Sequence, residues 1–217
     1  MKTAIVIGAT GLVGSHLTGQ LLETDDYKLV KVFARCPISR ENPKLESHIV
    51  DFENMESWQH LITGHELFSA LGTTLKKAGS KETQYKVDFT FQYDVAVAAA
   101  NNEVQKYLLV SSVGANAASN NFYLRMKGEL DQKVSDLPFH QIMILKPSIL
   151  AGKRDESRGL EELGVSLAKP LIRILPFLRK YRPIDGEIVA AAMIKAAGID
   201  SKEKVVEYVL DEIFELL

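Results

Sequence analysis

This sequence has a single cysteine, no long apolar run and no surplus of basic residues, and each shortage argues against a class of protein. Because Cys36 is the only cysteine, no internal disulfide can form, and a reducing compartment, the cytoplasm, is expected. The lack of 18 consecutive apolar residues argues against stable membrane insertion. A formal net charge of −2 lacks the basic excess that nucleic-acid-binding proteins show. The five histidines form no HxxxH pair or cluster, so no metal site is expected.

A glycine-rich turn follows an apolar, strand-like segment at the amino terminus and precedes a segment with helical periodicity. The glycines are spaced GxxGxxG, not in the more common GxGxxG pattern. A strand that ends in spaced glycines and opens a helix is typical of a dinucleotide pyrophosphate site, with a plain strand–turn–helix as the alternative. In this interpretation Gly8 permits the turn, Gly11 lets the backbone approach phosphate, and Gly14 lets helix and strand pack closely. The residues expected to hold the cofactor here are Gly8, Thr10, Gly11, Leu12, Val13 and Gly14.

Strand-like segments alternate with amphipathic ones over the first 150 residues, which predicts a single-domain, doubly wound α/β fold with a parallel sheet covered by helices on both faces. The expected strands are Thr3–Ile7, Leu29–Ala34, His48–Val50, Glu66–Leu71, Lys106–Ser111 and Gln141–Leu145, with helical segments near 12–23, 54–62, 81–102 and 121–136. We divide the domain into a dinucleotide-binding core, 1–150, and a small substrate or lid region, 151–217. A helix over Asp185–Ala197 is expected in that region, with Asp185 as N-cap and Gly198 as its stop.

Tyr123 and Lys127 are four residues apart, which places them on one face of the expected helix. An ammonium beside a phenol favours the phenolate, so this tyrosine could exchange a proton with a carbonyl or carbinol while hydride moves. Ser111 and Ser112 end the fifth expected strand, at the sheet edge where doubly wound folds bind ligands, and either could orient a substrate oxygen. The alternatives are a surface Tyr–Lys pair and serines that only cap a strand.

These motifs, in this order, resemble those of the short-chain dehydrogenase/reductase superfamily. The glycine spacing and Val110–Ala115 resemble its atypical branch. More narrowly, Phe68–Thr74, Tyr123–Glu129 and Lys146-Pro147 resemble the Tat-interacting-protein-type oxidoreductases and their bacterial relatives, over about residues 1–195. The resemblance implies an NAD(P)-binding Rossmann fold with Ser112 (or its neighbour Ser111), Tyr123 and Lys127 in the catalytic roles. It also implies that Lys127 holds the nicotinamide ribose hydroxyls and that Pro147 lies beside the nicotinamide.

The residue after the second expected strand argues for NADP(H) rather than NAD(H). NAD-selecting sites usually place a carboxylate there, whereas this chain has Arg35, which suits a ribose 2′-phosphate; a surface arginine is the alternative. Asp51 and Phe52 follow the third strand, where superfamily members often contact adenine, although Asp51 could instead cap a helix near Asn54. Leu71, Gly72 and Thr73 end the fourth strand, where Gly72 would let the backbone pass close to the cofactor.

The function expected from these features is an NADP(H)-dependent oxidoreductase acting on a small carbonyl or alcohol. The alternative is an NADP(H)-binding sensor with little turnover that acts through a protein partner, and a homodimer is also possible. A sugar-nucleotide epimerase is disfavoured because only about 70 residues follow the sixth strand. The basic, apolar stretch 167–182 is expected to form a lid over the substrate crevice, with membrane or partner docking as alternatives.

Overall fold

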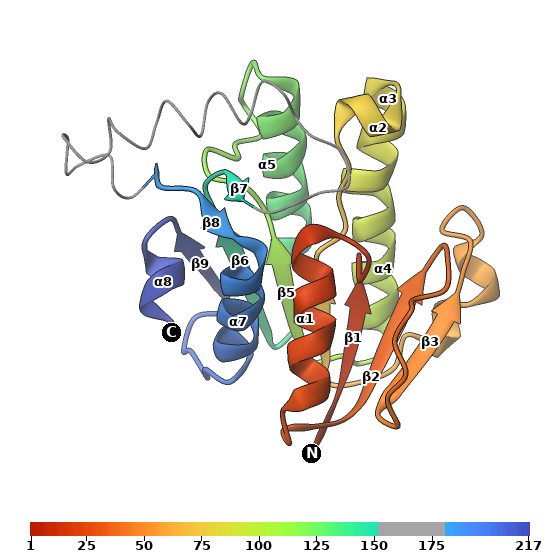
Figure 1. Ribbon diagram of the computed structural model, residues 1–217. Helices are drawn as coiled ribbons and strands as arrows, with labels where there is room; N and C mark the ends of the chain where they lie inside the picture. The colour runs from red at the N-terminus through yellow and green to blue at the C-terminus, as the bar shows by residue number, and fades with distance from the viewer. Residues whose placement is uncertain (152–180) are drawn as a thin grey trace.

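The computed structural model describes residues 1–151 and 181–217, and its centre is a seven-stranded sheet in the order β3-β2-β1-β4-β5-β6-β9 (Figure 1). Every neighbouring pair in this sheet is parallel. A second, two-stranded ladder joins β7 to β8. The strands are β1 (Lys2–Ile7), β2 (Tyr27–Ala34), β3 (Leu45–Ile49), β4 (Glu66–Ser69), β5 (Lys106–Val110), β6 (Gln141–Lys146), β7 (Leu150–Ala151), β8 (Ile184–Asp185) and β9 (Val205–Val209).

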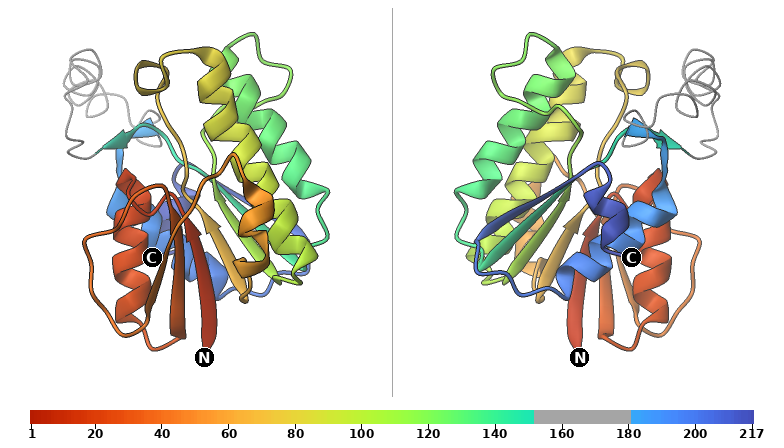
Figure 2. Two further views of the ribbon diagram at one scale, coloured as in Figure 1. Left: turned by 90° about the vertical axis from the view of Figure 1, so that its right-hand side faces the viewer. Right: turned by 90° about the vertical axis from the view of Figure 1, so that its left-hand side faces the viewer.

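Helices cover both faces of the large sheet, as the edge-on views of Figure 2 show. Helices α1 (Leu12–Glu23) and α7 (Gly186–Ala197) lie on one face, and α4 (Phe91–Asn101) and α5 (Phe122–Ser135) lie on the other. The alternation of side chains along a strand divides the core accordingly, because Ala4 and Val6 belong to one buried cluster and Ile5 and Ile7 to the other. The doubly wound α/β fold expected from the sequence is therefore confirmed.

The segment expected as one helix over 81–102 is interrupted by a π-helical turn. Helix α3 (Lys81–Tyr85) continues through the π-turn η3 (Lys86–Thr90) into α4, and a short helix, α2 (Leu75–Ala78), precedes it. A π-turn inserts a residue into the helical repeat, and such turns frequently occur at functional sites. Here it turns Asp88 inward, with only 2% of its surface exposed.

The prediction of a helix over 54–62 is wrong. The structure has two short 3₁₀ turns there, η1 (Met55–Ser57) and η2 (Gln59–Leu61). The two turns meet at Trp58, whose indole N–H donates to the Asp51 carbonyl at 2.8 Å and whose ring stacks on Phe33. These contacts turn the indole into the core and bend the chain there, so a continuous α-helix does not form.

The strand β9 is not evident from the sequence, and it places part of the carboxyl-terminal region in the main sheet beside β6. Helix α7 begins one residue after Asp185, as expected, but the Asp185 side chain makes no capping hydrogen bond, and Gly198 keeps right-handed backbone angles. A final short helix, α8 (Glu212–Glu215), follows β9. Most of the stretch expected as a lid, 167–182, lies outside the described residues, so the lid and the division at residue 150 stay predictions.

Candidate active site

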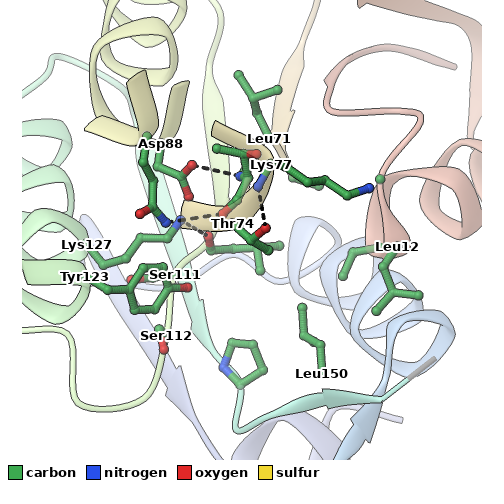
Figure 3. Close-up of a pocket in the computed structure, with 18 of the residues that line it drawn as sticks. Leu12, Leu71, Thr74, Lys77, Asp88, Ser111, Ser112, Tyr123, Lys127 and Leu150 are labelled. Atoms are coloured by element: carbon green, nitrogen blue, oxygen red, sulfur yellow. Dashed lines mark hydrogen bonds between the residues drawn. The ribbon is translucent and has the colours of Figure 1, made fainter. Parts of the chain in front are cut away.

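A cavity of about 1200 Å³ opens at the carboxyl ends of the central strands. Its walls come from the glycine turn after β1, the segment after β4 with the short helices and the π-turn that follow it, the serines after β5, helix α5 and the segment after β6. Figure 3 shows Tyr123 and Lys127 projecting from α5 into this space, with Leu12 of the glycine turn on the opposite wall. The topology therefore brings the separate sequence motifs together in one place.

The glycine turn is held by close contacts that a side chain would prevent. Gly8 has a φ of +82°, and a Cβ built there would lie 2.4 Å from the Ala70 carbonyl. A Cβ at Gly14 would lie 2.1 Å from the Gly8 carbonyl oxygen. Helix α1 starts after Gly11 without a side-chain cap, so N–H groups of its first turn stay available next to the cavity. Of the six residues predicted here, Thr10, Gly11, Leu12 and Val13 line the cavity, an arrangement suited to a pyrophosphate.

Helix α5 presents Tyr123 and Lys127 one turn apart. The helix starts at a cap in which the Asn121 side chain accepts from the Leu124 N–H at 3.1 Å. Tyr123 is 37% exposed at the cavity, whereas Lys127 is only 3% exposed and its Nζ donates to the Val110 carbonyl at 3.2 Å. The ammonium is thus fixed beneath the cavity, and the phenol is open to it.

The two serines after β5 have different environments. Ser111 is buried and its Oγ donates to Asp131 Oδ2 at 2.9 Å. Burial raises the pKa of the Asp131 carboxyl, while the Ser111 hydrogen bond and Lys146, whose Nζ is 3.4 Å from Oδ2, oppose that rise. Ser112 is half-buried and its Oγ donates weakly to the Val113 carbonyl at 3.3 Å. Both serines line the cavity, but Ser111 is already bound to a carboxylate.

Asp88 is a cavity residue that sequence reasoning missed. Its Oδ2 accepts from the Thr73 N–H at 2.8 Å, and a Cβ at Gly72 would lie 3.2 Å from its Oδ1. Gln92 donates to its backbone carbonyl at 2.6 Å. Burial raises the pKa of Asp88, opposed first by the charge of Lys127 and then by the Thr73 N–H. An acidic residue between the apolar Val87 and Phe89 was the only signal in the sequence.

Arg35 lies in a second cavity, of about 490 Å³, which shares Thr73, Lys76 and Lys77 with the first. Arg35 follows β2, and the two lysines belong to α2, so three cationic side chains from distant segments line this space. The lysines are a further feature that the sequence pattern did not reveal, since nothing in their spacing connects them with Arg35. The concentration of positive charge suits an anion.

The remaining predicted cofactor residues divide into two groups. Leu71, Gly72, Thr73 and Pro147 line the larger cavity. Asp51 and Phe52 line neither cavity. Asp51 Oδ1 accepts from the Glu53 N–H at 2.9 Å, and Phe52 packs in the core with its ring centroid 5.3 Å from that of Trp58.

Within residues 1–151 and 181–217 no group of His, Cys, Asp and Glu side chains could hold a metal ion, and no helix there is long and apolar enough to cross a membrane.

Comparison with known proteins agrees with this arrangement. A family model described as NAD(P)H-binding matches residues 8–159. Protein FMP52-1, mitochondrial, of Scheffersomyces stipitis is 35% identical over 201 residues, covering 90% of this chain and 88% of the relative. Protein fmp52, mitochondrial, of Aspergillus fumigatus is 33% identical over 203 residues, covering 90% of this chain and 87% of the relative.

Solved structures share the fold at low sequence identity. MoeE5 in complex with UDP-glucuronic acid and NAD has a TM-score of 0.71 at 14% identity, covering 96% of this chain and 76% of MoeE5. The UDP-glucose 4-epimerase of Thermotoga maritima has a TM-score of 0.69 at 14% identity, covering 98% of this chain and 80% of the epimerase. At such identities the likeness shows a Rossmann fold alone.

The comparisons correct one expectation. A cytoplasmic location was expected because the chain has a single cysteine, but relatives at 30–35% identity are named as mitochondrial proteins. Those names point to mitochondria rather than to the cytoplasm. The single cysteine misled because scarce cysteine argues only against a disulfide-rich, oxidising compartment and does not distinguish among compartments that keep thiols reduced.

Proposed function

This chain belongs to the NAD(P)H-binding family and has the Rossmann fold of short-chain dehydrogenase/reductase proteins, and on that premise we propose that it transfers hydride between NADP(H) and a small carbonyl or alcohol. One observation carries the proposal: Ser112, Tyr123 and Lys127 line the same cavity as the uncapped first turn of α1. A cofactor bound along the glycine turn would lie in the same space as a proton donor. Its nicotinamide would supply the hydride, and the protein would supply position and protons.

In this proposal Tyr123 is the general acid in the direction of reduction. Its hydroxyl, open to the cavity, donates a proton to the substrate oxygen as negative charge develops there, and it accepts that proton in the reverse direction. The buried ammonium of Lys127, one helical turn away, stabilises the phenolate that remains and binds the nicotinamide ribose hydroxyls.

Ser112 is the serine that we assign to the substrate oxygen. The Ser111 hydroxyl donates its one hydrogen bond to Asp131 Oδ2, so Ser111 has no donor left for a substrate. Among residues 1–151 and 181–217, the Ser112 hydroxyl has only the long contact to Val113, and it can turn toward the cavity at little cost. Exchange of Ser112 for alanine should therefore lower turnover far more than the same exchange at Ser111, once both variants are shown to fold.

The central test is the Tyr123→Phe variant, assayed for NADPH consumption with a panel of aldehydes, ketones and quinones. Loss of the proton donor should lower turnover by about 10²-fold or more and leave NADPH affinity nearly unchanged. Tyr208→Phe, on β9 and outside the cavity, is the matched control and should behave as the wild type. Unchanged turnover in Tyr123→Phe would refute the mechanism. Tight NADPH binding without reduction of any carbonyl would instead favour a cofactor sensor that acts through a protein partner.

The preference for NADP(H) is supported by Arg35 and the basic cavity next to it. A guanidinium can form paired, charge-assisted hydrogen bonds with a 2′-phosphate that NAD lacks. Arg35→Ala should weaken NADPH binding by roughly tenfold, about 1.4 kcal/mol, with little effect on NADH. Calorimetric titration with NADPH and with NADH measures the ratio of the two affinities. Equal affinities in the wild type that persist in the variant would refute this assignment.

A further inference from the structure

Lys81 lines the larger cavity, and the proposed mechanism gives it no role. It is the first residue of α3, is exposed, and shares the cavity wall with Phe122 and Tyr123 at the start of α5. We propose that Lys81 binds a carboxylate of the substrate, so that the protein acts on a carbonyl compound, or the matching alcohol, that carries an acid group. This inference rests on the proposed function and names the class of its substrate.

Two contacts between α3 and α5 fix the position of Lys81. Its Nζ lies over the ring of Phe122, 5.5 Å from the ring centroid. One helical turn further along α3, the Tyr85 hydroxyl donates to Glu129 Oε2 at 3.0 Å. Phe122 is half-buried and directly precedes Tyr123 in the chain. Because the face of an aromatic ring attracts an ammonium, the charge of Lys81 is held at the end of the cavity that contains the proposed proton donor.

The cavity has more positive than negative charge. Four lysines and a single carboxylate are among the described residues that line it. That carboxylate, Asp88, is 2% exposed and already accepts from the Thr73 N–H. The structure gives Lys81 no ion pair within residues 1–151 and 181–217, and its neighbour Glu82 does not line the cavity. An anion that enters the cavity would therefore meet an uncompensated charge at Lys81.

The other lysines of the cavity are suited to the cofactor. Lys127 is assigned to the nicotinamide ribose, and Lys76 and Lys77 also line the smaller cavity that contains Arg35. Lys81 does not line that smaller cavity, so it is not placed for the 2′-phosphate. The pyrophosphate is expected at the first turn of α1, on the wall opposite Tyr123 (Figure 3). Lys81 is therefore the cation that remains for a substrate.

A single ammonium suits a carboxylate better than a phosphate. A phosphate group carries nearly two charges at neutral pH and is usually bound by several cations or by a guanidinium fork. Lys81 supplies one charge, and its three N–H donors are not all directed at the Phe122 ring. A substrate held by its acid group at Lys81 and by its carbonyl oxygen at Tyr123 would be fixed at two points, which orients it for reaction.

Matched pairs of aldehydes test this assignment. Each pair consists of an acid and its methyl ester, one aliphatic (4-oxobutanoate) and one aromatic (4-formylbenzoate), so that the two members differ mainly in charge. Lys81→Met keeps the apolar stem and removes the charge, whereas Lys81→Arg keeps the charge. Lys86→Met is the matched control, because Lys86 also lies over a ring, with its Nζ 5.9 Å from the Phe91 centroid, but lines neither cavity.

We expect the KM of the wild type for at least one acid to be about tenfold lower than for its ester, because the ester lacks the charge that Lys81 attracts. Lys81→Met should raise the KM for that acid about tenfold and abolish the preference, whereas Lys81→Arg should retain most of it. Lys86→Met should behave as the wild type, and added salt should reduce the preference. A preference that is unchanged in Lys81→Met would overturn the inference, and so would weaker NADPH binding in that variant without an effect on the acid.

Binding measurements separate this inference from the proposed function. Calorimetric titration of the NADP⁺-loaded protein with each acid and each ester requires no turnover. If the wild type reduces no carbonyl but binds an acid about tenfold more tightly than its ester, and Lys81→Met loses that difference, the proposed function fails and the role of Lys81 is supported. Equal affinities within both pairs, absence of binding included, would overturn the inference.

The Phe122→Leu variant provides a second, independent test. Loss of the ring should weaken binding of the acid about threefold in the wild-type background, because the ring holds the ammonium in place. In the Lys81→Met background the same change should have no effect on the acid, since no charge remains to be positioned. Equal effects of Phe122→Leu in both backgrounds would contradict the pairing of the ring with Lys81.

Discussion

Gly14 shows how strongly a single residue of the glycine turn is constrained. A methyl group there would lie 2.1 Å from the Gly8 carbonyl oxygen, a backbone atom that cannot move without disturbing β1. Gly14→Ala should therefore lower the free energy of unfolding by about 3 kcal/mol or more. Gly19→Ala in the same helix is the matched control, because its methyl group would meet only the mobile end of the Arg40 side chain. Urea denaturation compares the two. Equal stability of both variants would contradict this packing.

The burial of Tyr107 on β5 leads to a prediction about how the stability of the fold depends on pH. Its ring is fully buried against Phe139, and its hydroxyl forms no hydrogen bond within the described part of the chain. Burial is the main cause that raises the pKa of Tyr107, so the folded state holds this proton more tightly than the unfolded state. That contribution to stability is complete below the unfolded pKa of about 10 and is lost as pH rises above it.

Tyr107→Phe should keep the ring packing and remove both the unpaired hydroxyl and this titration. At pH 7 the variant should be as stable as the wild type or up to about 1 kcal/mol more stable. Between pH 9 and 11 it should lose less stability than the wild type. Thermal unfolding at several pH values measures the difference, and the prediction fails if the two proteins destabilise in parallel on the alkaline side.

Residues in local motifs could be predicted from the sequence, and residues that act across the fold could not. The glycines, Tyr123 and Lys127 have spacings that directly reflect a turn or a helix face, and the structure brings these motifs to one cavity. Asp88 and Lys76 belong to no such spacing, since their significance depends on which segments the sheet order makes neighbours.

At the level of elements, the central strands could be identified from the sequence, because a strand that is buried on both faces has a continuous run of apolar residues. Strand β9 lacks that signal. It is the last strand in the sheet order, its residues are only half-buried or exposed, and Glu207 within it pairs with Lys146 at 2.7 Å. The π-turn was equally hidden, since an inserted residue leaves the apolar pattern on either side intact.

The first turns of α1 and α7 form a contact with a consequence for cofactor binding. A Cβ at Gly186, the first residue of α7, would lie 2.6 Å from the Leu12 carbonyl oxygen, at the start of α1 beside the cavity. Gly186→Ala should therefore push this turn out of place and weaken NADPH binding roughly tenfold, while also lowering thermal stability.

Gly198→Ala, at the other end of α7, is the control for this effect. Its Cβ would lie 3.3 Å from the Lys195 carbonyl, and its backbone angles suit alanine, so affinity should stay close to the wild-type value. Fluorescence titration with NADPH measures both variants. An unaltered dissociation constant in Gly186→Ala would show that the contact between the two helices does not position the turn.

On the scale of the whole molecule, the amino- and carboxyl-terminal parts of the chain share one core. Val189, Ala192 and Met193 of α7 are fully buried in the same cluster as Val13 and Leu17 of α1. Removal of α7 and β9 would expose this face of α1 and the β6 edge of the sheet. Each large apolar side chain is worth about 1.5–3 kcal/mol when buried, so a few of them equal the whole stability of a typical domain.

A fragment of residues 1–150, the predicted dinucleotide-binding core, should therefore not fold by itself, although it contains the glycine turn, Tyr123 and Lys127. We expect little ellipticity change on heating, binding of a hydrophobic dye, and no NADPH titration, whereas the full chain should melt in one transition that NADPH moves upward. If the fragment melts cooperatively and binds NADPH, the core is autonomous, and the carboxyl-terminal region is an addition to it. A fragment without structure would show instead that the cofactor site depends on α7 and β9. These elements support the site indirectly, α7 by packing on α1 and β9 by completing the edge of the sheet.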